Sequence, residues 1–395
     1  MTGRVSSIAG RVARAGRRAE AVQQVRERRS VFLLVPVAML LIVGLGAMLS
    51  ASSVVSIRES PTADQFYLFK RQLMWVGIGL AAFVVTIRIP YRWWARVALP
   101  MFLASVTLLL ATVVVGDSRN GAARWIEIGP FTIQAGEFAK LATITLLAAA
   151  LAKKERWLGD LPHFAYPVAA ILGVVGLLIM LQPDFGTLLI IIGASFAVMA
   201  ASAAPLRYVA GLALLGAGMM TALAFSAPYR LRRLVGFLDP FADPLGNGHQ
   251  AVQSLVALGT GGLFGIGLGA SRARWSFLPN AHTDFIFAII GEETGLAGAM
   301  LIVLLFMVLA VVGVRIALQA PDRFGRLMAM GIVAWLTVQA LVNIGGVVAV
   351  LPITGVPLPF VSAGGNAMLM NLAAVGILVN IARSPLTGAS GAEIR

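Results

Sequence analysis

Long apolar runs alternate with short polar segments along almost the whole chain. A helix needs about 20 residues to cross the roughly 30 Å of hydrocarbon in a bilayer. The runs predict ten membrane-spanning helices, over residues 31–52, 72–88, 97–115, 134–152, 164–181, 185–203, 207–226, 284–314, 326–350 and 358–382. Their glycines and prolines fit this prediction, because neighbouring membrane helices can supply the backbone hydrogen bonds that these residues interrupt. The predicted fold is an all-α integral membrane protein, a polytopic bundle over residues 31–384.

Composition and charge agree with this class of protein. Of 395 residues, 59% are hydrophobic and 12% are charged, whereas about a quarter of the residues in a soluble domain are charged. The absence of cysteine excludes disulfides and thiolate metal sites. A net charge of +14 would suggest nucleic acid as a partner of a soluble protein. Here we interpret it as the excess of Lys and Arg that marks cytoplasmic loops, with no nucleic-acid partner.

The distribution of basic residues predicts the orientation in the membrane. Residues 1–30 contain eight arginines and two glutamates and few large apolar residues, which favours a disordered cytoplasmic segment that also contacts anionic lipid. Each predicted inner loop then carries basic residues, namely Arg88, Arg92, Arg96, Lys153, Lys154, Arg156, Arg207, Arg315, Arg323, Arg326 and Arg383. Both termini, including the short tail 385–395, are therefore predicted to face the cytoplasm.

One long loop, residues 227–283, is predicted on the outer side between the seventh and eighth spans. It contains five arginines, at positions 230, 232, 233, 272 and 274. These could bind an anionic ligand, since guanidinium suits phosphate, or could contact lipid headgroups and structural ion-pair partners. Within the loop, His249 to Leu258 could form a short re-entrant or interfacial helix with Gln253 on its polar side. The glycines that follow favour a tightly packed loop beside a substrate groove.

Ionisable residues inside apolar runs are candidates for function. Glu137 and Lys140 are three residues apart, hence on one helix face, and could be functional or a mutually neutralising structural pair. Asp184, at a predicted outer turn, could cap a helix. Trp125, in the outer loop before the fourth span, could serve a site or lie in an interfacial aromatic belt.

The stretch LPNAHTDFIFAIIGEETG, residues 278–295, contains the strongest candidate. Asp284 stands at the start of the eighth span, where it could cap the helix or act as a water-accessible general base beside arginines. Glu292 and Glu293 lie deeper and on different faces of the helix, so we expect them to pair within the bundle. Further on, LPITGVPLPFVSAGG predicts an irregular start to the tenth span.

These motifs together resemble a known family. The stretch above, FLDPFADPLGNGHQAVQS in the long loop, SASSV at 50–54, RWIEIGPFTIQ at 124–134, EFAKL at 137–141, QPDFGT at 182–187 and LPITGVPLPFVSAGG at 351–365 are similar to the FtsW/RodA group, the SEDS peptidoglycan glycosyltransferases. They occur in family order over roughly residues 30–385, and they look more like the division-type FtsW members than the elongation-type RodA members.

The resemblance implies an extracytoplasmic polymerase of lipid II that releases undecaprenyl pyrophosphate. Asp284 matches the family's proposed general base, and Arg233 matches an arginine that could offset pyrophosphate charge. The remaining candidate substrate-binding residues are Lys140, Glu137, Trp125, His282, Gln253 and Ser362. No dedicated metal cage is readable, so Mg or Mn would be held by Asp284 and substrate phosphates.

The family also implies partners and a place in the cell. These are a class B penicillin-binding protein that acts as transpeptidase, other divisome proteins and membrane lipid, at the septum of the bacterial cytoplasmic membrane. The alternatives are a lipid II flippase, an elongation-type polymerase and a non-catalytic scaffold. Departures from the family pattern leave open a paralogue with altered partners or reduced activity; they are Asn280, Ala135, Gly136, Ala363, Asn366 and Ala367.

Overall fold

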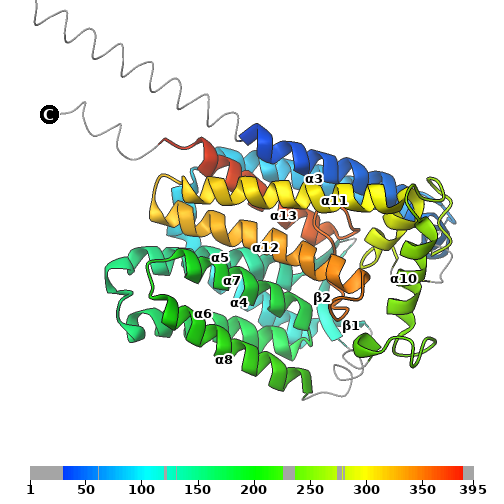
Figure 1. Cartoon of the computed structure of the whole chain (residues 1–395). Coiled ribbons are helices and arrows are strands. Elements are labelled where there is room, and N and C mark those ends of the chain that lie inside the picture. Colours follow the sequence, from blue (N-terminus) through cyan, green and yellow to red (C-terminus); the bar gives the residue numbers. More distant parts are fainter. Residues whose placement is uncertain are drawn as a thin grey trace, which may run out of the picture.

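Long helices packed side by side form the body of the protein (Figure 1). The structure is a computed structural model that describes residues 30–60, 62–119, 122–129, 131–225, 236–273, 278 and 281–385. The long helices are Ser30–Ala51, α3 (Tyr67–Arg88), α4 (Tyr91–Val115), α5 (Ala135–Lys153), α6 (Leu161–Leu181), α7 (Phe185–Ala201), α8 (Leu206–Phe225), α11 (Ile286–Leu318), α12 (Arg323–Val347) and α13 (Gly365–Arg383). The predicted N-terminal segment 1–30 and tail 385–395 lie almost wholly outside the described residues.

The helical membrane bundle is confirmed. Among the described residues, nine helices are long and apolar enough to span a bilayer, and α7, with 17 residues, is a shorter apolar helix. Each predicted span overlaps one of these ten helices, although several ends differ. The third span was expected from 97 but begins at Tyr91, directly after Pro90. The helix includes the more polar residues that precede its apolar run. The tenth, expected from 358, begins at Gly365, because prolines in the preceding segment interrupt regular backbone hydrogen bonding.

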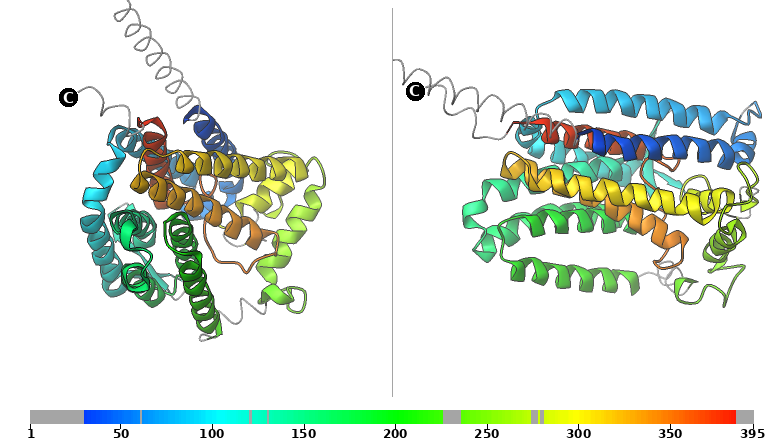
Figure 2. Two further views of the ribbon diagram at one scale, coloured as in Figure 1. Left: turned by 60° about the vertical axis from the view of Figure 1, so that its left-hand side comes forward. Right: turned by 45° about the horizontal axis from the view of Figure 1, so that its top comes forward.

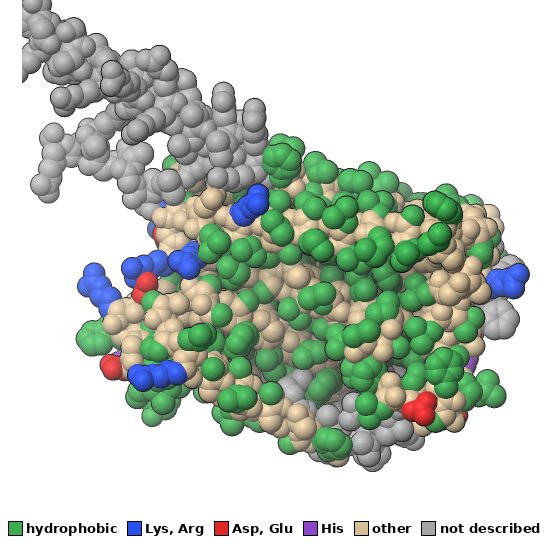
Figure 3. Space-filling model, in the orientation of Figure 1, with side chains coloured by type: hydrophobic (Ala, Val, Ile, Leu, Met, Phe, Trp, Pro, Cys, Tyr) green, Lys and Arg blue, Asp and Glu red, His purple; other side chains and the backbone are tan. Residues whose placement is uncertain are grey.

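Three helices lie at the centre of the bundle. In the apolar windows of α5, α12 and α13, 72%, 67% and 78% of the residues are buried, against 6% for α8. Figure 2 shows the long helices side by side in two further views. The long flank of the molecule visible in Figure 3 is largely hydrophobic, and basic side chains gather mostly near one end. This surface fits a protein surrounded by lipid.

Smaller elements gather at the other end of the bundle, which we call the sheet end (Figure 1). An antiparallel sheet of order β1-β2-β3 is formed by Asp117–Arg119, Ala122–Ile128 and Phe131–Gln134. The short helix α2 (Ser53–Glu59) follows the first long helix, and α10 (His249–Gly261) lies across the bundle. The predicted helix at 249–258 is thus confirmed, whereas the sheet was not predicted. Strand β3 runs directly into α5 at Ala135, without a connecting loop.

Helix α11 is broken near its start, at Gly295, whose φ of 70° is favourable for glycine. A loop that follows α10 pairs with the backbone exposed by this break. The amides of Ile266 and Gly267 donate to the carbonyls of Glu292 and Glu293 at 3.0 and 3.1 Å. The loop is thereby held against the side of α11.

The side chains of the two adjacent glutamates on α11 hold different segments. Glu292 accepts hydrogen bonds from the amides of Arg272 and Ala273 at 3.2 and 3.3 Å. Glu293 accepts one from the Ser50 hydroxyl, at the end of the first long helix. Both carboxylates are buried. The prediction that they pair inside the bundle is confirmed.

Candidate functional site

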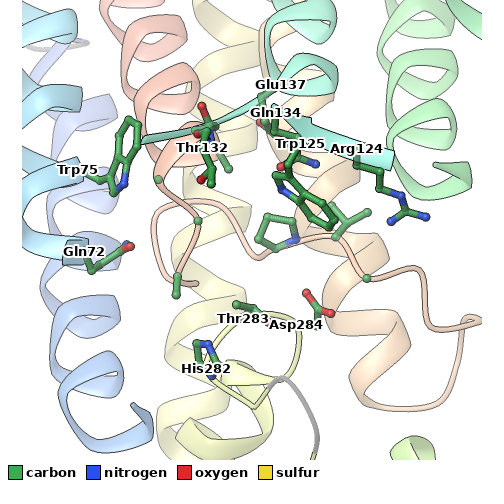
Figure 4. A pocket seen from close by; sticks show the side chains of 18 of the residues that line it. Gln72, Trp75, Arg124, Trp125, Thr132, Gln134, Glu137, His282, Thr283 and Asp284 are labelled. Carbon is green, nitrogen blue, oxygen red and sulfur yellow. The ribbon is translucent and has the colours of Figure 1, made fainter. Parts of the chain in front are cut away.

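A polar cavity of about 470 Å³ opens at the sheet end of the bundle. Its walls come from α3, the sheet, the start of α5, the segment before α11, and the irregular segment 351–364 before α13. Figure 4 shows His282 and Asp284 on one side and Glu137, Gln134 and Trp125 on the other. The polar and aromatic lining residues are Glu59, Arg71, Gln72, Trp75, Arg124, Trp125, Thr132, Gln134, Glu137, Asp184, Thr187, His282, Thr283, Asp284, Thr354 and Asn366.

Asp284 lines this cavity from the segment before α11. The helix-cap alternative is wrong, because the N-cap residue of α11 is Phe285 and Asp284 precedes it. The Asp284 carbonyl accepts a hydrogen bond from the Asn343 amide at 2.8 Å. A Cβ at Gly355, whose φ is 74°, would lie 3.6 Å from the Asp284 Oδ2. Glycine at that position therefore leaves space beside the carboxylate.

His282 lies two residues before Asp284 and lines the same cavity. Its carbonyl accepts a hydrogen bond from the amide of Ala363 at 3.1 Å. Burial lowers the pKa of the imidazole, and the nearby Glu59 carboxylate opposes this effect only in part. Its Nδ1 is buried and has no hydrogen-bond partner among the described residues. Burial at the cavity wall therefore favours the uncharged form of His282.

Glu137 and Lys140 form the predicted pair on α5. The Lys140 Nζ lies 2.9 Å from both carboxylate oxygens of Glu137, and the two side chains are 1% and 2% exposed. Lys140 also donates to the Gln339 Oε1 at 2.8 Å and lies 5.0 Å from the centroid of the Trp335 ring. Glu137 reaches the cavity, whereas Lys140 lies behind it. The pair thus neutralises itself at the inner end of the cavity.

The sheet contributes Trp125 and Arg124 to the cavity (Figure 4). The Arg124 side chain is held in place by contacts of its guanidinium. This group donates to the Gln182 carbonyl at 3.4 Å and lies 3.8 Å from the Asp184 Oδ1. Asp184 is the N-cap of α7 and accepts from the Thr187 amide at 3.3 Å. The predicted capping role of Asp184 is confirmed. The sheet is therefore anchored to the bundle where it borders the cavity.

Besides Lys140, two predicted substrate-binding residues in the described part of the chain do not line the cavity. Gln253 lies on α10, which packs against α11. Ser362 is buried, and its hydroxyl accepts from the Leu358 amide at 2.8 Å, so it shapes the irregular segment. Arg233 and Asn280 lie outside the described residues.

Other residues of the cavity were missed by sequence reasoning. Gln72 and Trp75 come from α3, where the polar stretch KRQ at 70–72, ahead of the main apolar run, was the available signal. Trp75 packs so closely on Gly365 that a Cβ there would lie 2.3 Å from its ring. Asn366 donates to the Thr132 carbonyl at 2.7 Å and so joins α13 to the sheet. Asn366 is a departure from the family pattern, and here it holds two walls of the cavity together.

Metal-binding capacity at the cavity is limited. Within the part of the chain that the structure describes, no three His, Asp or Glu side chains converge as metal ligands. The cavity offers the carboxylate of Asp284 next to open space. A divalent cation would therefore need oxygens of a ligand to complete its shell, since Mg²⁺ takes six oxygen ligands.

A bundle of apolar helices with a polar cavity at one end defines an integral membrane protein with a candidate ligand site. The chain belongs to the FtsW, RodA and SpoVE family of cell cycle proteins, whose model matches residues 31–386. It is 40% identical over 353 residues to stage V sporulation protein E of Bacillus subtilis, covering 89% of this chain and 96% of that protein. It is 38% identical over 357 residues to a probable peptidoglycan glycosyltransferase FtsW of Geobacter metallireducens, covering 90% and 95%.

Solved structures agree with this assignment. A chain from a structure described as the structural coordination of polymerization and crosslinking by a peptidoglycan synthase complex matches with a TM-score of 0.73 at 30% identity, covering 89% of this chain and 96% of that chain. The rod shape determining protein RodA of Thermus thermophilus matches with a TM-score of 0.66 at 27% identity, covering 89% and 95%. The family resemblance of the sequence motifs is confirmed.

Proposed function

We propose that the protein is a peptidoglycan glycosyltransferase that polymerises lipid II into glycan strands and releases undecaprenyl pyrophosphate. The observation that carries this proposal is the Asp284 carboxylate at the wall of a polar cavity of about 470 Å³. A cavity of this volume accepts a group of the size of a sugar unit, while lipid tails stay outside among the helices. The family membership and the names of the relatives support the same reaction class.

In the proposed reaction, Asp284 acts as general base. It removes the proton from the acceptor sugar hydroxyl as that oxygen attacks the anomeric carbon of the donor. The bond from that carbon to the pyrophosphate breaks, and its electron pair leaves with the pyrophosphate. Attack from the opposite face inverts the carbon and gives a β-1,4 linkage. A free Asp has a pKa of about 4, so deprotonation accompanies attack, and such catalysis contributes a factor of about 100 to 10,000.

The leaving pyrophosphate requires positive charge near the cavity. Arg233, in the long loop, is the proposed partner from the family motif. Arg71 lines the cavity and donates to the Thr132 hydroxyl at 3.4 Å, so its guanidinium lies in the cavity wall, as does that of Arg124. A divalent cation bound by Asp284 and the phosphates would add further charge. Trp125 and His282 line the cavity, where the indole and the imidazole could contact a sugar ring.

The proposed surroundings follow from the charge pattern and the family. Both termini face the cytoplasm, so the sheet end and its cavity face outward, where the lipid-linked substrate is polymerised. The partner is a class B penicillin-binding protein, and the related peptidoglycan synthase complex, described as coordinating polymerization with crosslinking, supports such a pairing. Other divisome proteins complete the assembly at the septum.

A reconstituted polymerisation assay tests the proposal. The purified protein, with a candidate transpeptidase partner, is expected to convert fluorescent lipid II into glycan strands resolved by gel electrophoresis. Asp284→Ala should abolish the product. Asp239→Ala is the control, because Asp239 is an exposed acid in the long loop 227–283 and is not among the residues lining the cavity. Normal polymer from Asp284→Ala would refute the assignment of the base. Lipid II translocation in liposomes without any polymer would favour the flippase instead.

A further inference from the structure

Two amide side chains on α12 hold the irregular segment that borders the cavity. Gln339 and Asn343 are four residues apart, so they lie on one face of the helix. The Asn343 Nδ2 donates to the Val356 carbonyl at 2.8 Å, and the Gln339 Nε2 donates to the Pro357 carbonyl at 2.8 Å. Both side chains are buried. Consecutive carbonyls of a segment without regular structure are thus fixed by one helix face.

The same Asn343 nitrogen also reaches the candidate base. It donates to the main-chain carbonyl of Asp284 at 2.8 Å. An amide NH₂ group carries two hydrogens, so one group can serve both carbonyls. The Val356 carbonyl that it holds adjoins Gly355, the residue beside the Asp284 carboxylate. A single side chain therefore fixes Asp284 and the opposing wall relative to one helix.

Gln339 extends this connection to the other side of the cavity. Its Oε1 accepts from the Lys140 Nζ at 2.8 Å and from the Trp335 Nε1 at 2.8 Å. Lys140 in turn holds the Glu137 carboxylate. One face of α12 thus links the backbone of Asp284 to Glu137 across the cavity. In a low-dielectric interior, breaking any of these bonds would leave a buried polar group without its partner, which disfavours rearrangement of the network.

We propose that Asn343 is a positioning residue, which sets the place of the Asp284 carboxylate by binding its main chain and that of Val356. This inference rests on the proposed glycosyltransferase function. The segment 351–364 contains no helix or strand. Besides turn hydrogen bonds and the bond from the Ala363 amide to the His282 carbonyl, the buried amides of Gln339 and Asn343 hold it in place. A displacement of about 1 Å of a catalytic group can cost about 100-fold in rate. Asn343 touches no reacting atom and acts only through Asp284.

The chain provides a matched control for testing Asn343. Asn371, on α13, is also a buried asparagine, at 1% exposure, and neither its Nδ2 nor its Oδ1 has a hydrogen-bond partner among the described residues. Asn343→Leu removes the amide donor, and Asn343→Asp removes it with little change of shape. Both are expected to lower kcat for lipid II polymerisation by about 10- to 100-fold, with KM changed by less than about 3-fold. Asn371→Leu is expected to retain the wild-type kcat.

Hydrogen exchange supplies a readout that does not depend on activity. In Asn343→Leu, amides in residues 281–285 and 351–358 are expected to exchange faster than in the wild type, whereas Asn371→Leu leaves both segments unchanged. Unaltered exchange and a wild-type kcat in Asn343→Leu, with Asp284→Ala inactive, would overturn the inference and leave the proposed function standing. A wild-type protein that forms no polymer with its partner would refute the proposed function and the role of Asn343 in it. In that case exchange would still decide whether Asn343 anchors these segments.

Discussion

Removing one charge of the buried pair on α5 should destabilise the protein more than removing both. Glu137→Gln leaves the Lys140 ammonium, 1% exposed, without its counter-charge. Its other contacts, to Gln339 and the Trp335 ring, remain. The double variant Glu137→Gln/Lys140→Met removes the uncompensated charge. Gln339 then still accepts a hydrogen bond from the Trp335 Nε1 at 2.8 Å, so its oxygen stays satisfied.

The magnitude follows from the burial of the pair. Breaking a buried ion pair by removing one partner costs about 3–5 kcal/mol, whereas replacing both partners by apolar groups is often neutral. Because Lys140 keeps two favourable contacts, we expect about 3 kcal/mol for Glu137→Gln. An unfolding entropy of about 2.1 cal/mol/K per residue, over 395 residues, converts this to a fall of about 4 °C in Tm.

Thermal unfolding in detergent measures the difference. Glu137→Gln should lower Tm by about 4 °C, and the double variant should recover most of that loss. The ion pair of Lys70 and Asp64, at 2.8 Å with side-chain exposures of 68% and 28%, provides the control. Lys70→Met should leave Tm nearly unchanged, because water screens an exposed pair. Equal losses in the single and double variants would refute the reasoning, since they would show that the charge of Lys140 is not the source of the cost.

Two further predictions concern the cavity walls. Gly365→Ala should lower the unfolding free energy by about 1–3 kcal/mol through overpacking, because the new Cβ would lie 2.3 Å from the Trp75 ring; Gly77→Ala, with open space around it, should cause no loss in the same thermal assay. The lowered pKa of His282 means that the unfolded chain binds the proton more readily than the folded one. Stability should therefore fall as the pH drops below about 6.5 and level off below the folded pKa, and His282→Gln should reduce this dependence of Tm on pH.

The membrane architecture and the main candidate were predictable because their signals are local. Apolar runs identify membrane helices directly, since the backbone must satisfy itself in lipid. The pairing of Glu137 with Lys140 follows from a spacing of three residues on a helix. The place of Asp284 at the start of a span was predicted because the apolar run begins directly after it.

The missing parts of the site depend on contacts between segments far apart in the chain. The strands around Trp125 are short, and they pair with each other. Their sequences show no strong alternation of apolar and polar residues that would have predicted them. Asn343 and Gln339 are uncharged amides within an apolar run and did not stand out beside ionisable groups. Their role appears only when segment 351–364 folds against α12 and supplies the carbonyls that they bind.

The direct junction of β3 and α5 has a mechanical consequence. Trp125 is paired with Gln134 across the sheet, and Gln134 is followed at once by the first turn of α5, which carries Glu137. No flexible linker separates the surface of the cavity from the charge pair inside the membrane. A displacement of β2 at Trp125 would therefore shift its neighbour Gln134 and, through the continuous backbone, the first turn of α5 with Glu137.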